Sequence, residues 1–158
     1  MAATLGVPSH DAEAQRGARV GGLAPEITGG PWINSPPLSM EQLRGRVVFV
    51  EFWTKNVIPQ LRDWHAKYEK DGLTIVGVHT PEFSWEKPPD KVAAATRELG
   101  VRYPVVQDND YAIWRRYSTW AWPTRVVIDR KGVIRYTHIG EGAYEETERW
   151  LRRLLAER

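Results

Sequence analysis

The chain has 158 residues, a length that suits one domain able to bury about two thirds of its unfolded surface. Its 22 lysines and arginines nearly balance 20 acidic residues and are scattered among them, which argues against nucleic acid as the main partner. Cysteine is absent, so disulfides, thiolate metal sites and thiol catalysis are excluded for the chain as written.

Neither a membrane span nor a signal peptide is evident in the sequence. No apolar run approaches the ~18 residues that a transmembrane helix needs, and residues 1–20 lack the apolar core of a secretory signal. We therefore expect no membrane insertion by this chain. Residues 1–22 are small and polar without sustained periodicity, as in a flexible arm or linker, so the folded domain is expected at residues 23–158.

The first elements are predicted from turn residues and apolar runs. Residues 22–45 are dense in proline and glycine, which favours turns and short edge pairings. Ser39 is expected to cap a helical turn that ends at Gly45. Residues 47–53, VVFVEFW, form an almost continuous apolar run typical of a central strand covered on both faces, with Glu51 as the exception.

A helix is predicted directly after this strand. Apolar residues recur at helical spacing over residues 57–68, and Gly72 closes the segment. Asn56 is the expected cap, and Pro59 lies in the first turn, where its missing N–H costs little. Residues 73–80, LTIVGVHT, form a second buried strand. Strand, helix and strand with short links indicate a right-handed parallel βαβ unit.

The remaining elements alternate helices with strands. We expect a helix at residues 90–99, a short strand around residues 104–108, a helix from Asp110 to Tyr117, a hairpin over residues 125–139 that turns at residues 130–132, and a helix from Tyr144 to Ala156. This order of elements indicates an α/β domain.

Several segments in a fixed order resemble one known family. The segments LAPEI, WINSPPLSMEQLRGRVVFVEFWT, GLTIVGVHTPEFSWEK, YPVVQDNDYAIWRRY and WPTRVVIDRKGVIRYTHIGEG are similar to their counterparts in the extracytoplasmic thiol-disulfide oxidoreductases of the TlpA/DipZ type. The resemblance runs from about Gly22 to the C-terminus. It implies a thioredoxin-like α/β fold with a central mixed sheet, helices on both faces and an N-terminal extension packed on the edge.

The resemblance also implies an activity, which is dithiol-disulfide exchange with protein or peptide thiols and disulfides. It implies no cofactor and an extracytoplasmic location, on the periplasmic or secreted side. In that family, a strand ending in Phe-Trp-Thr is followed by two residues, then Cys-x-x-Cys, and then a helix with a proline five positions after the second cysteine. The first cysteine lies at a helix N-terminus, where unpaired N–H groups and the helix dipole lower the thiol pKa.

The cysteine-bearing segment is missing from this chain. The Phe-Trp-Thr of residues 52–54 is followed at once by Lys-Asn-Val-Ile-Pro at residues 55–59, so four residues separate Thr54 from Pro59 where the family pattern has ten. The shortfall equals the length of x-x-Cys-x-x-Cys, and both flanks stay in frame. Natural degeneration, deliberate deletion and omission of a loop from the recorded sequence each account for it, and the undamaged flanks argue against the first.

One group of candidate site residues surrounds the missing cysteines. Glu51, Trp53, Thr54 and Lys55 remain there, and the resemblance puts Glu51 in the place of the buried acid that exchanges protons with the resolving thiol. A carboxyl within a buried strand is expected to have a raised pKa, suited to acid-base work near neutrality. The simpler alternative is a carboxyl satisfied by a buried lysine or by solvent. The absence of a thiol favours that alternative in the chain as written.

The second group of candidates lies at residues 120–124. Trp122, Pro123 and Thr124 match the family's cis-proline segment, which faces the cysteines and pairs with a bound peptide. We therefore expect a cis bond there, rather than an ordinary trans-proline that opens an edge strand. Trp53 and Trp120 are expected either to form an apolar rim for peptide side chains or to pack in the core.

The other polar residues are predicted to be structural. The histidines at positions 65, 79 and 138 lie on separate elements without the spacing of a metal site, so no metal is predicted. Residues 108–110 are interpreted as a turn and helix cap rather than a calcium loop. Three functions are left open: an oxidoreductase domain that lacks its redox segment, a redox-inactive module that binds a peptide or protein partner through the cis-proline groove, and a purely structural domain.

Overall fold

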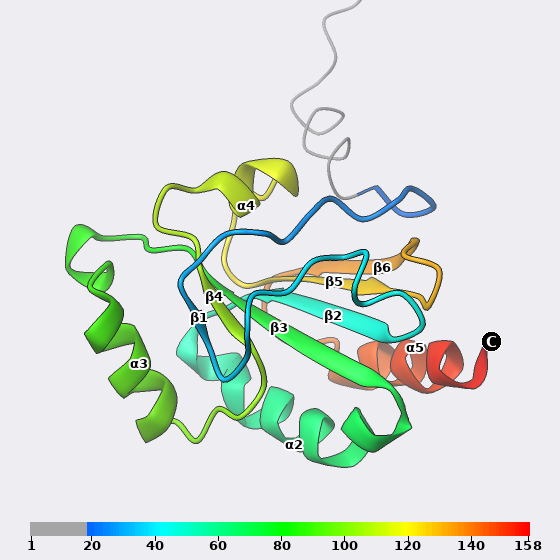
Figure 1. Ribbon diagram of the computed structural model, residues 1–158. Coiled ribbons are helices and arrows are strands. Elements are labelled where there is room, and N and C mark those ends of the chain that lie inside the picture. Colours follow the sequence, from blue (N-terminus) through cyan, green and yellow to red (C-terminus); the bar gives the residue numbers. More distant parts are fainter. Residues whose placement is uncertain (1–18) are drawn as a thin grey trace, which may run out of the picture.

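The structure is a computed structural model that describes residues 19–158 (Figure 1). The arm or linker predicted for residues 1–22 therefore lies largely outside the described residues. At its inner end, the Gly21 N–H donates to the Ile134 carbonyl at 2.8 Å, and Leu23 forms an antiparallel bridge with Val133. The described part of this segment is thus attached to the last strand of the sheet.

Strands and helices alternate along the described chain. The strands are β1 (Trp32–Ile33), β2 (Val47–Phe52), β3 (Leu73–His79), β4 (Val105–Gln107), β5 (Thr124–Ile128) and β6 (Ile134–Ile139). The α-helices are α2 (Ile58–Tyr68), α3 (Pro89–Glu98), α4 (Ala112–Arg116) and α5 (Tyr144–Ala156). Short 3-10 helices are η1 (Lys55–Val57), η2 (Glu69–Asp71) and η3 (Ser84–Glu86).

All six strands join one mixed sheet, in the order β1-β4-β3-β2-β5-β6. The central strand β2 pairs in parallel with β3 on one side and antiparallel with β5 on the other. β4 continues the parallel part, while β1 and β6 are antiparallel edge strands. The predicted mixed sheet, the parallel βαβ unit and the hairpin predicted over residues 125–139 are confirmed, and the hairpin begins one residue earlier, at Thr124.

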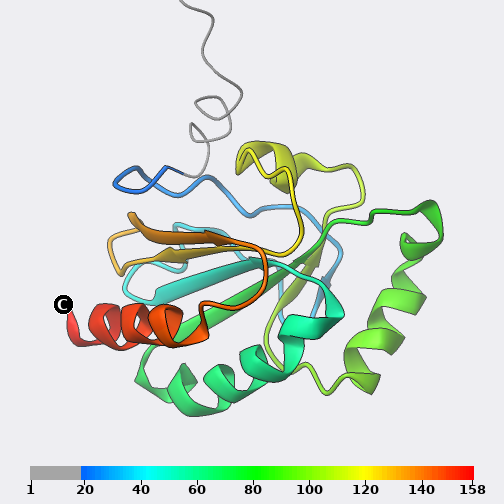
Figure 2. The ribbon, with the colours of Figure 1, turned by 180° about the vertical axis from the view of Figure 1, so that it is seen from behind.

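The sheet separates two hydrophobic cores because successive residues of a strand point to opposite faces. On one face, Phe49 packs with Trp64 of α2 and Leu151 of α5. On the other face, Val50 packs with Ile113 of α4 and with the N-terminal segment. Figure 1 shows α2 and α5 below the sheet and α4 with the N-terminal segment above it, and Figure 2 shows the same layers from behind.

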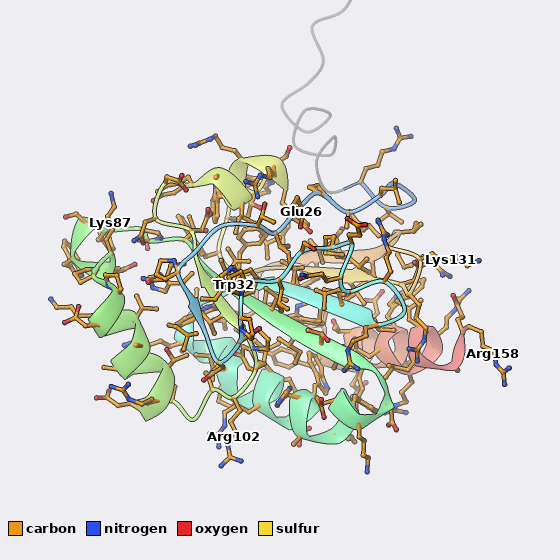
Figure 3. The ribbon with its side chains drawn as sticks, viewed as in Figure 1. Glu26, Trp32, Lys87, Arg102, Lys131 and Arg158 are labelled. Atoms are coloured by element: carbon orange, nitrogen blue, oxygen red, sulfur yellow. The ribbon has the colours of Figure 1, made fainter. Side chains whose placement is uncertain are left out.

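The N-terminal segment is held on this second face by a few polar contacts. Glu26, labelled in Figure 3, accepts hydrogen bonds at Oε1 from the N–H groups of Ile27 at 2.9 Å and Met40 at 2.8 Å. Trp32, also labelled there, begins the edge strand β1, which pairs with Val106 of β4. The extension therefore packs on the edge of the sheet, as the resemblance implies.

The junction after β2 differs from the prediction in one respect. Asn56 does not cap α2, because residues 55–57 form η1 and Val57 takes the N-cap position. The Asn56 amide instead donates to Glu141 Oε1 at 3.0 Å. Pro59 lies in the first turn of α2, as predicted. Only Trp53 and Thr54 separate β2 from η1, so the strand leads almost directly into the helix.

Residues 40–45 form a series of turns, and the predicted helical turn after Ser39 is confirmed, because the Leu43 N–H donates to the Ser39 carbonyl at 3.3 Å. The Ser39 hydroxyl accepts the Gln42 N–H at 3.3 Å, and the Gln42 side chain accepts the Ser39 N–H at 3.1 Å, which is the reciprocal capping expected at a helix start. The segment ends at Gly45, whose φ of +94° is left-handed. The run is too short for a helix to propagate beyond its first turn.

The start of α4 is held by an aspartate two residues before the predicted cap. Asp108 accepts the N–H groups of Ile113 at 2.8 Å and Trp114 at 2.9 Å, and also the Thr80 hydroxyl at 2.7 Å. The Asp110 carboxyl accepts the Ala112 N–H at 3.2 Å. The prediction of a turn and helix cap at residues 108–110 is confirmed, with Asp108 as its main acceptor.

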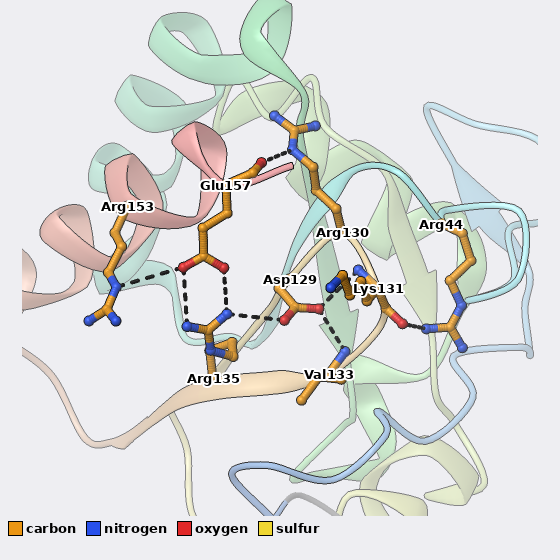
Figure 4. A network of polar contacts seen from close by, with 8 residues as sticks. All are labelled: Arg44, Asp129, Arg130, Lys131, Val133, Arg135, Arg153 and Glu157. Carbon is orange, nitrogen blue, oxygen red and sulfur yellow. Dashed lines mark hydrogen bonds and ion pairs between the residues drawn. The ribbon is translucent and has the colours of Figure 1, made fainter.

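The turn between β5 and β6 carries a dense polar network (Figure 4). Asp129 accepts the N–H groups of Lys131 at 2.9 Å and Val133 at 3.0 Å, and its second oxygen accepts Arg135 at 3.2 Å. Arg135 also donates two hydrogen bonds to Glu157, at 2.6 and 3.1 Å. Because β5 runs antiparallel to β2, this network lies at the end of the sheet opposite the junction after β2.

Candidate active site

The site predicted from the sequence lies where β2 and β3 end and β5 begins. Parallel strands end at the same edge of a sheet, and antiparallel β5 starts there, with Phe52 opposite Thr124. A pocket of about 410 Å³ opens at this edge. Its lining residues are Trp53, Thr54, Lys55, His79, Thr80, Glu82, Trp85, Glu86, Lys91, Val92, Ala95 and Trp122.

The pocket brings together only part of the predicted site. Trp53, Thr54 and Lys55 from the junction after β2 line it, together with Trp122 from the segment before β5. Pro123 and Thr124 are buried next to Trp122 and are not among the lining residues. Glu51 is likewise absent from the lining, because it points into the core beneath the pocket rather than into it.

Glu51 is fully buried in the middle of the sheet, with 1% of its surface exposed. Its register neighbours are Gly77 on β3 and Arg125 on β5. Neither carboxyl oxygen has a hydrogen-bond partner among the described residues, and Oε2 lies 3.8 Å from Arg125 Nε. Burial raises the pKa of Glu51 to about 8, against the opposing effect of the Arg125 charge. The predicted rise in this pKa is confirmed. The charged side chain beside the carboxyl is an arginine, where the simpler alternative expected a lysine or solvent.

Trp53 covers the floor of the pocket because a glycine leaves room for its ring. A Cβ atom on Gly77 would lie 3.2 Å from the Trp53 indole and 3.2 Å from the Tyr103 ring. The Trp53 ring also packs against His79, with centroids 5.3 Å apart. Its indole N–H is buried without a partner among the described residues. Trp53 thus both packs on the core and lines the pocket.

His79 was predicted to be a packing or surface group. It ends β3 and is half-buried, because its ring packs on Trp53 and also lines the pocket. Burial lowers the pKa of His79, although the nearby Glu86 carboxylate acts in the opposite direction. The imidazole is therefore held neutral close to neutral pH.

The Trp122–Pro123 peptide bond is cis, as predicted. Trp122 packs on Trp114 of α4, with ring centroids 4.1 Å apart. The Pro123 carbonyl accepts the Gly140 N–H at 2.8 Å, which ties the segment to the loop after β6. Trp120, by contrast, is 61% exposed and does not pack in the core. A second cis bond, Gly30–Pro31, was not predicted.

Sequence reasoning missed two further features of this region. Arg125 is 1% exposed and, among the described residues, is the ion-pair partner of Glu51. Phe83 and Trp85 stack in parallel with ring centroids 4.5 Å apart, and they are 46% and 63% exposed. The aromatic residues of PEFSWEK were a signal for the second feature, whereas an arginine in an apolar strand gives no sign of its partner.

Comparison with known proteins identifies the family. The pattern that defines the AhpC/TSA family matches residues 20–137. The chain belongs to this family. Protein DipZ of Mycobacterium bovis is 40% identical over 144 residues, which are 85% of this chain and 21% of DipZ. The thiol-disulfide oxidoreductase YkuV of Bacillus subtilis is 29% identical over 141 residues, covering 84% of this chain and 94% of YkuV.

Solved structures agree with this AhpC/TSA assignment. The crystal structure of a thioredoxin-like superfamily protein superposes with a TM-score of 0.79 and 25% identity, covering 86% of this chain and 97% of that one. The thioredoxin-like fold and the resemblance to thiol-disulfide oxidoreductases are therefore confirmed. This AhpC/TSA chain has no cysteine, so it is redox-inactive as written.

The described part of this AhpC/TSA domain has neither a membrane-spanning helix nor a cluster of metal-binding side chains. Over residues 19–158, no helix has the length and apolar character to cross a bilayer. In the same range, no three His, Cys, Asp or Glu side chains gather in a way that suits a metal ion.

Proposed function

We propose that this chain is the thioredoxin-like domain of a protein that exchanges thiols and disulfides with protein substrates, and that its redox segment is absent between Thr54 and Lys55. The DipZ relatives are about five times longer than the matched region, so the proposal concerns the domain. An extracytoplasmic location and protein or peptide thiols and disulfides as partners form part of the proposal, on the strength of the resemblance.

One observation carries this proposal. A buried carboxyl with a pKa near 8 lies under a junction that joins a strand to a helix, and a cis-proline segment faces that junction. Burying an ionisable group in a core costs free energy, and strongly shifted pKa values are concentrated at functional sites, where proton transfer makes use of them. A dithiol at the start of α2 would use it, because thiol-disulfide exchange needs one thiol deprotonated and the leaving thiolate protonated.

The experiment restores the missing segment. Ala-Ala-Cys-Ala-Ala-Cys is inserted between Thr54 and Lys55, and the matched control carries serine in place of both cysteines. We expect the cysteine insertion to accelerate reduction of insulin disulfides by dithiothreitol at least about tenfold, and the serine insertion to leave the uncatalysed rate unchanged. A cysteine insertion that folds, by circular dichroism, without accelerating the reaction would refute the proposal.

The composition of the native protein is checked separately. Intact mass and thiol titration of protein purified from its natural source test whether the hexapeptide is present in the cell. Two titratable thiols and a mass larger by six residues would show that the recorded sequence omits the segment. No thiols and an unchanged mass would show that the natural molecule itself is redox-inactive.

A second candidate function rests on the exposed aromatic residues around the pocket. Trp85 lines the pocket, is 63% exposed and stacks on Phe83, which is 46% exposed, and large apolar side chains exposed together mark interaction surfaces. In this alternative, the cysteine-free chain binds a peptide or protein partner in the cis-proline groove. Saturable quenching of tryptophan fluorescence by unfolded, cysteine-free peptides would support it, and loss of that binding in Trp122→Ala would place it at the pocket. Absence of binding at millimolar peptide would exclude it.

A further inference from the structure

Arg125 is an arginine in a place where arginines are rare. It lies on β5, two residues after Pro123, and only 1% of its surface is exposed. Charged side chains are almost never buried this completely unless they are paired. In the antiparallel register, Arg125 stands directly opposite Glu51, so both side chains point to the same face of the sheet.

The guanidinium head of Arg125 is fixed by contacts with the start of α5. Nη1 donates to the Gly142 carbonyl at 2.8 Å and to the Thr147 hydroxyl at 2.9 Å. The guanidinium carbon lies 5.2 Å from the centre of the Tyr144 ring, within range of a cation–π interaction. Nε has no hydrogen-bond partner among the described residues and lies 3.8 Å from Glu51 Oε2. The head is therefore held beside the carboxyl, at a distance too long for a hydrogen bond.

The other neighbours of Glu51 do not supply a balancing charge. β3 presents Gly77, and α5 presents the uncharged Thr147 and Tyr144. The buried phenol of Tyr103 feels the Glu51 charge, because that charge adds to the effect of burial in raising the pKa of Tyr103. Tyr103 also contacts the His65 ring of α2, and the Arg62 charge of the same helix acts to lower the pKa of Tyr103. Arg125 is thus the cation that acts on Glu51 among the described residues.

We propose that Arg125 is a positioning residue for Glu51: it is anchored on the start of α5 and holds its charge beside the carboxyl, so that the carboxyl can release and regain a proton without leaving the core. The role in catalysis rests on the function proposed above. The effect of Arg125 on the titration of Glu51 does not rest on that function, since both residues are present in the cysteine-free chain.

The distance of 3.8 Å explains why the proton can be exchanged. A carboxyl buried alone would stay protonated at every working pH, because desolvation penalises its charged form. A carboxyl with two short hydrogen bonds from an arginine would stay ionised. Arg125 donates hydrogen bonds from Nη1 to Gly142 and Thr147. It acts on Glu51 through its charge alone, because its Nε lies 3.8 Å from the carboxyl. The balance leaves the pKa of Glu51 at about 8, where proton transfer near neutrality is efficient.

The test measures the titration of Glu51 directly in the cysteine-free protein. Carboxyl carbon-13 NMR, with the Glu51 signal assigned from Glu51→Gln, gives its pKa in the parent and in Arg125→Gln, Arg125→Met and Arg125→Lys. We expect either neutral variant to raise the pKa of Glu51 by about one unit or more, because it loses an opposite charge within about 4 Å. The lysine variant keeps the charge and should show less than half of that rise.

Arg135→Gln is the matched control, because Arg135 is a partly buried arginine of the neighbouring strand that pairs with Asp129 and Glu157. It should leave the pKa of Glu51 unchanged. A neutral variant at position 125 that folds and leaves this pKa unchanged would overturn the proposal. If neither neutral variant folds, Arg125→Lys is the deciding measurement. A pKa of Glu51 more than about one unit above that of the parent would overturn the proposal, because it would show that a positive charge at position 125 is not sufficient to hold this pKa down.

The same variants separate this inference from the proposed function. In the protein that carries the inserted Cys-x-x-Cys, Arg125→Gln should move the alkaline limb of the pH–rate profile upward by the amount measured for Glu51, and Arg135→Gln should not. An inactive insertion protein would refute the proposed function and leave the NMR result standing. An active insertion protein with an unmoved limb would refute the positioning role alone.

Discussion

Glu51→Gln should remove a large pH dependence from the stability of the domain. Glutamine reproduces the shape and neutrality of the protonated carboxyl, so it isolates the cost of ionising Glu51. The pKa of Glu51 rises from an ordinary value of 4.5 to about 8 on folding because the side chain is buried. Since the folded state then binds the proton more tightly than the unfolded state, the contribution is fully present below about pH 4.5 and is lost as the pH rises towards 8.

The magnitude follows from the two pKa values. One pKa unit is worth about 1.4 kcal/mol, so raising the pH from 4 to 9 should lower the unfolding free energy by about 5 kcal/mol through Glu51 alone. At pH 4 the parent and Glu51→Gln should have similar stability. At pH 7 the variant should be more stable by about 3 kcal/mol. That is a large share of the ~5–15 kcal/mol that a domain of this size has in total.

Urea unfolding followed by tryptophan fluorescence, at intervals from pH 4 to 9, measures this difference, because the chain has eight tryptophans. The urea dependence of the unfolding free energy should be the same in both proteins, since the surface exposed on unfolding is unchanged. Glu41→Gln, at an exposed position, is the matched control and should follow the parent at every pH. Parallel profiles for the parent and Glu51→Gln would refute the assignment of a raised pKa to this carboxyl.

Two further predictions concern the packing under the pocket and the far end of the sheet. Gly77→Ala should destabilise the domain by about 1–3 kcal/mol and shift the fluorescence of Trp53, because the new Cβ would lie 3.2 Å from that indole. Gly29→Ala, whose Cβ would meet its nearest neighbour at 3.5 Å, should stay within about 0.5 kcal/mol, and equal effects of the two changes would contradict this packing argument. Asp129→Ala should cost about 2–3 kcal/mol in urea unfolding, since it leaves two turn N–H groups without an acceptor. Glu157→Ala, which removes only a part-exposed partner of Arg135, should cost about 1 kcal/mol or less, and a larger cost than that of Asp129→Ala would show that the ion pair rather than the turn stabilises this end.

Most of the fold could be predicted because its signals are local. The apolar run of residues 47–53, the helical spacing of residues 57–68 and Gly72 with its φ of +114° together define a βαβ unit without knowledge of the rest of the chain. The errors occurred where a tertiary contact competed with a local one. Asn56 has the side chain of a helix cap, but its amide bonds to Glu141, 85 residues away in the sequence.

The candidate site could be predicted only in outline. The raised pKa of Glu51 followed from its place in an apolar strand, and the cis bond at Pro123 followed from the resemblance. The partner of Glu51 did not, because Arg125 comes beside it only through the pairing of β2 with β5. The role of Gly77 could not be predicted either. Its missing side chain makes room for the indole of Trp53, the residue that follows the neighbouring strand β2. Such features depend on register between distant segments, and no local pattern encodes that register.

The polar network around Asp129 stabilises the end of the sheet that lies opposite the Thr54–Lys55 junction. Hydrogen bonds close the sheet at the β5–β6 turn, whereas at the Thr54–Lys55 end the buried side-chain polar atoms of Glu51, Trp53 and Thr54 have no hydrogen-bond partner within residues 19–158. The pairing of β2 with both of its neighbours runs uninterrupted up to that junction. An insertion between Thr54 and Lys55 is therefore expected to leave the pairing of the sheet intact, because the paired residues of β2 all precede that junction.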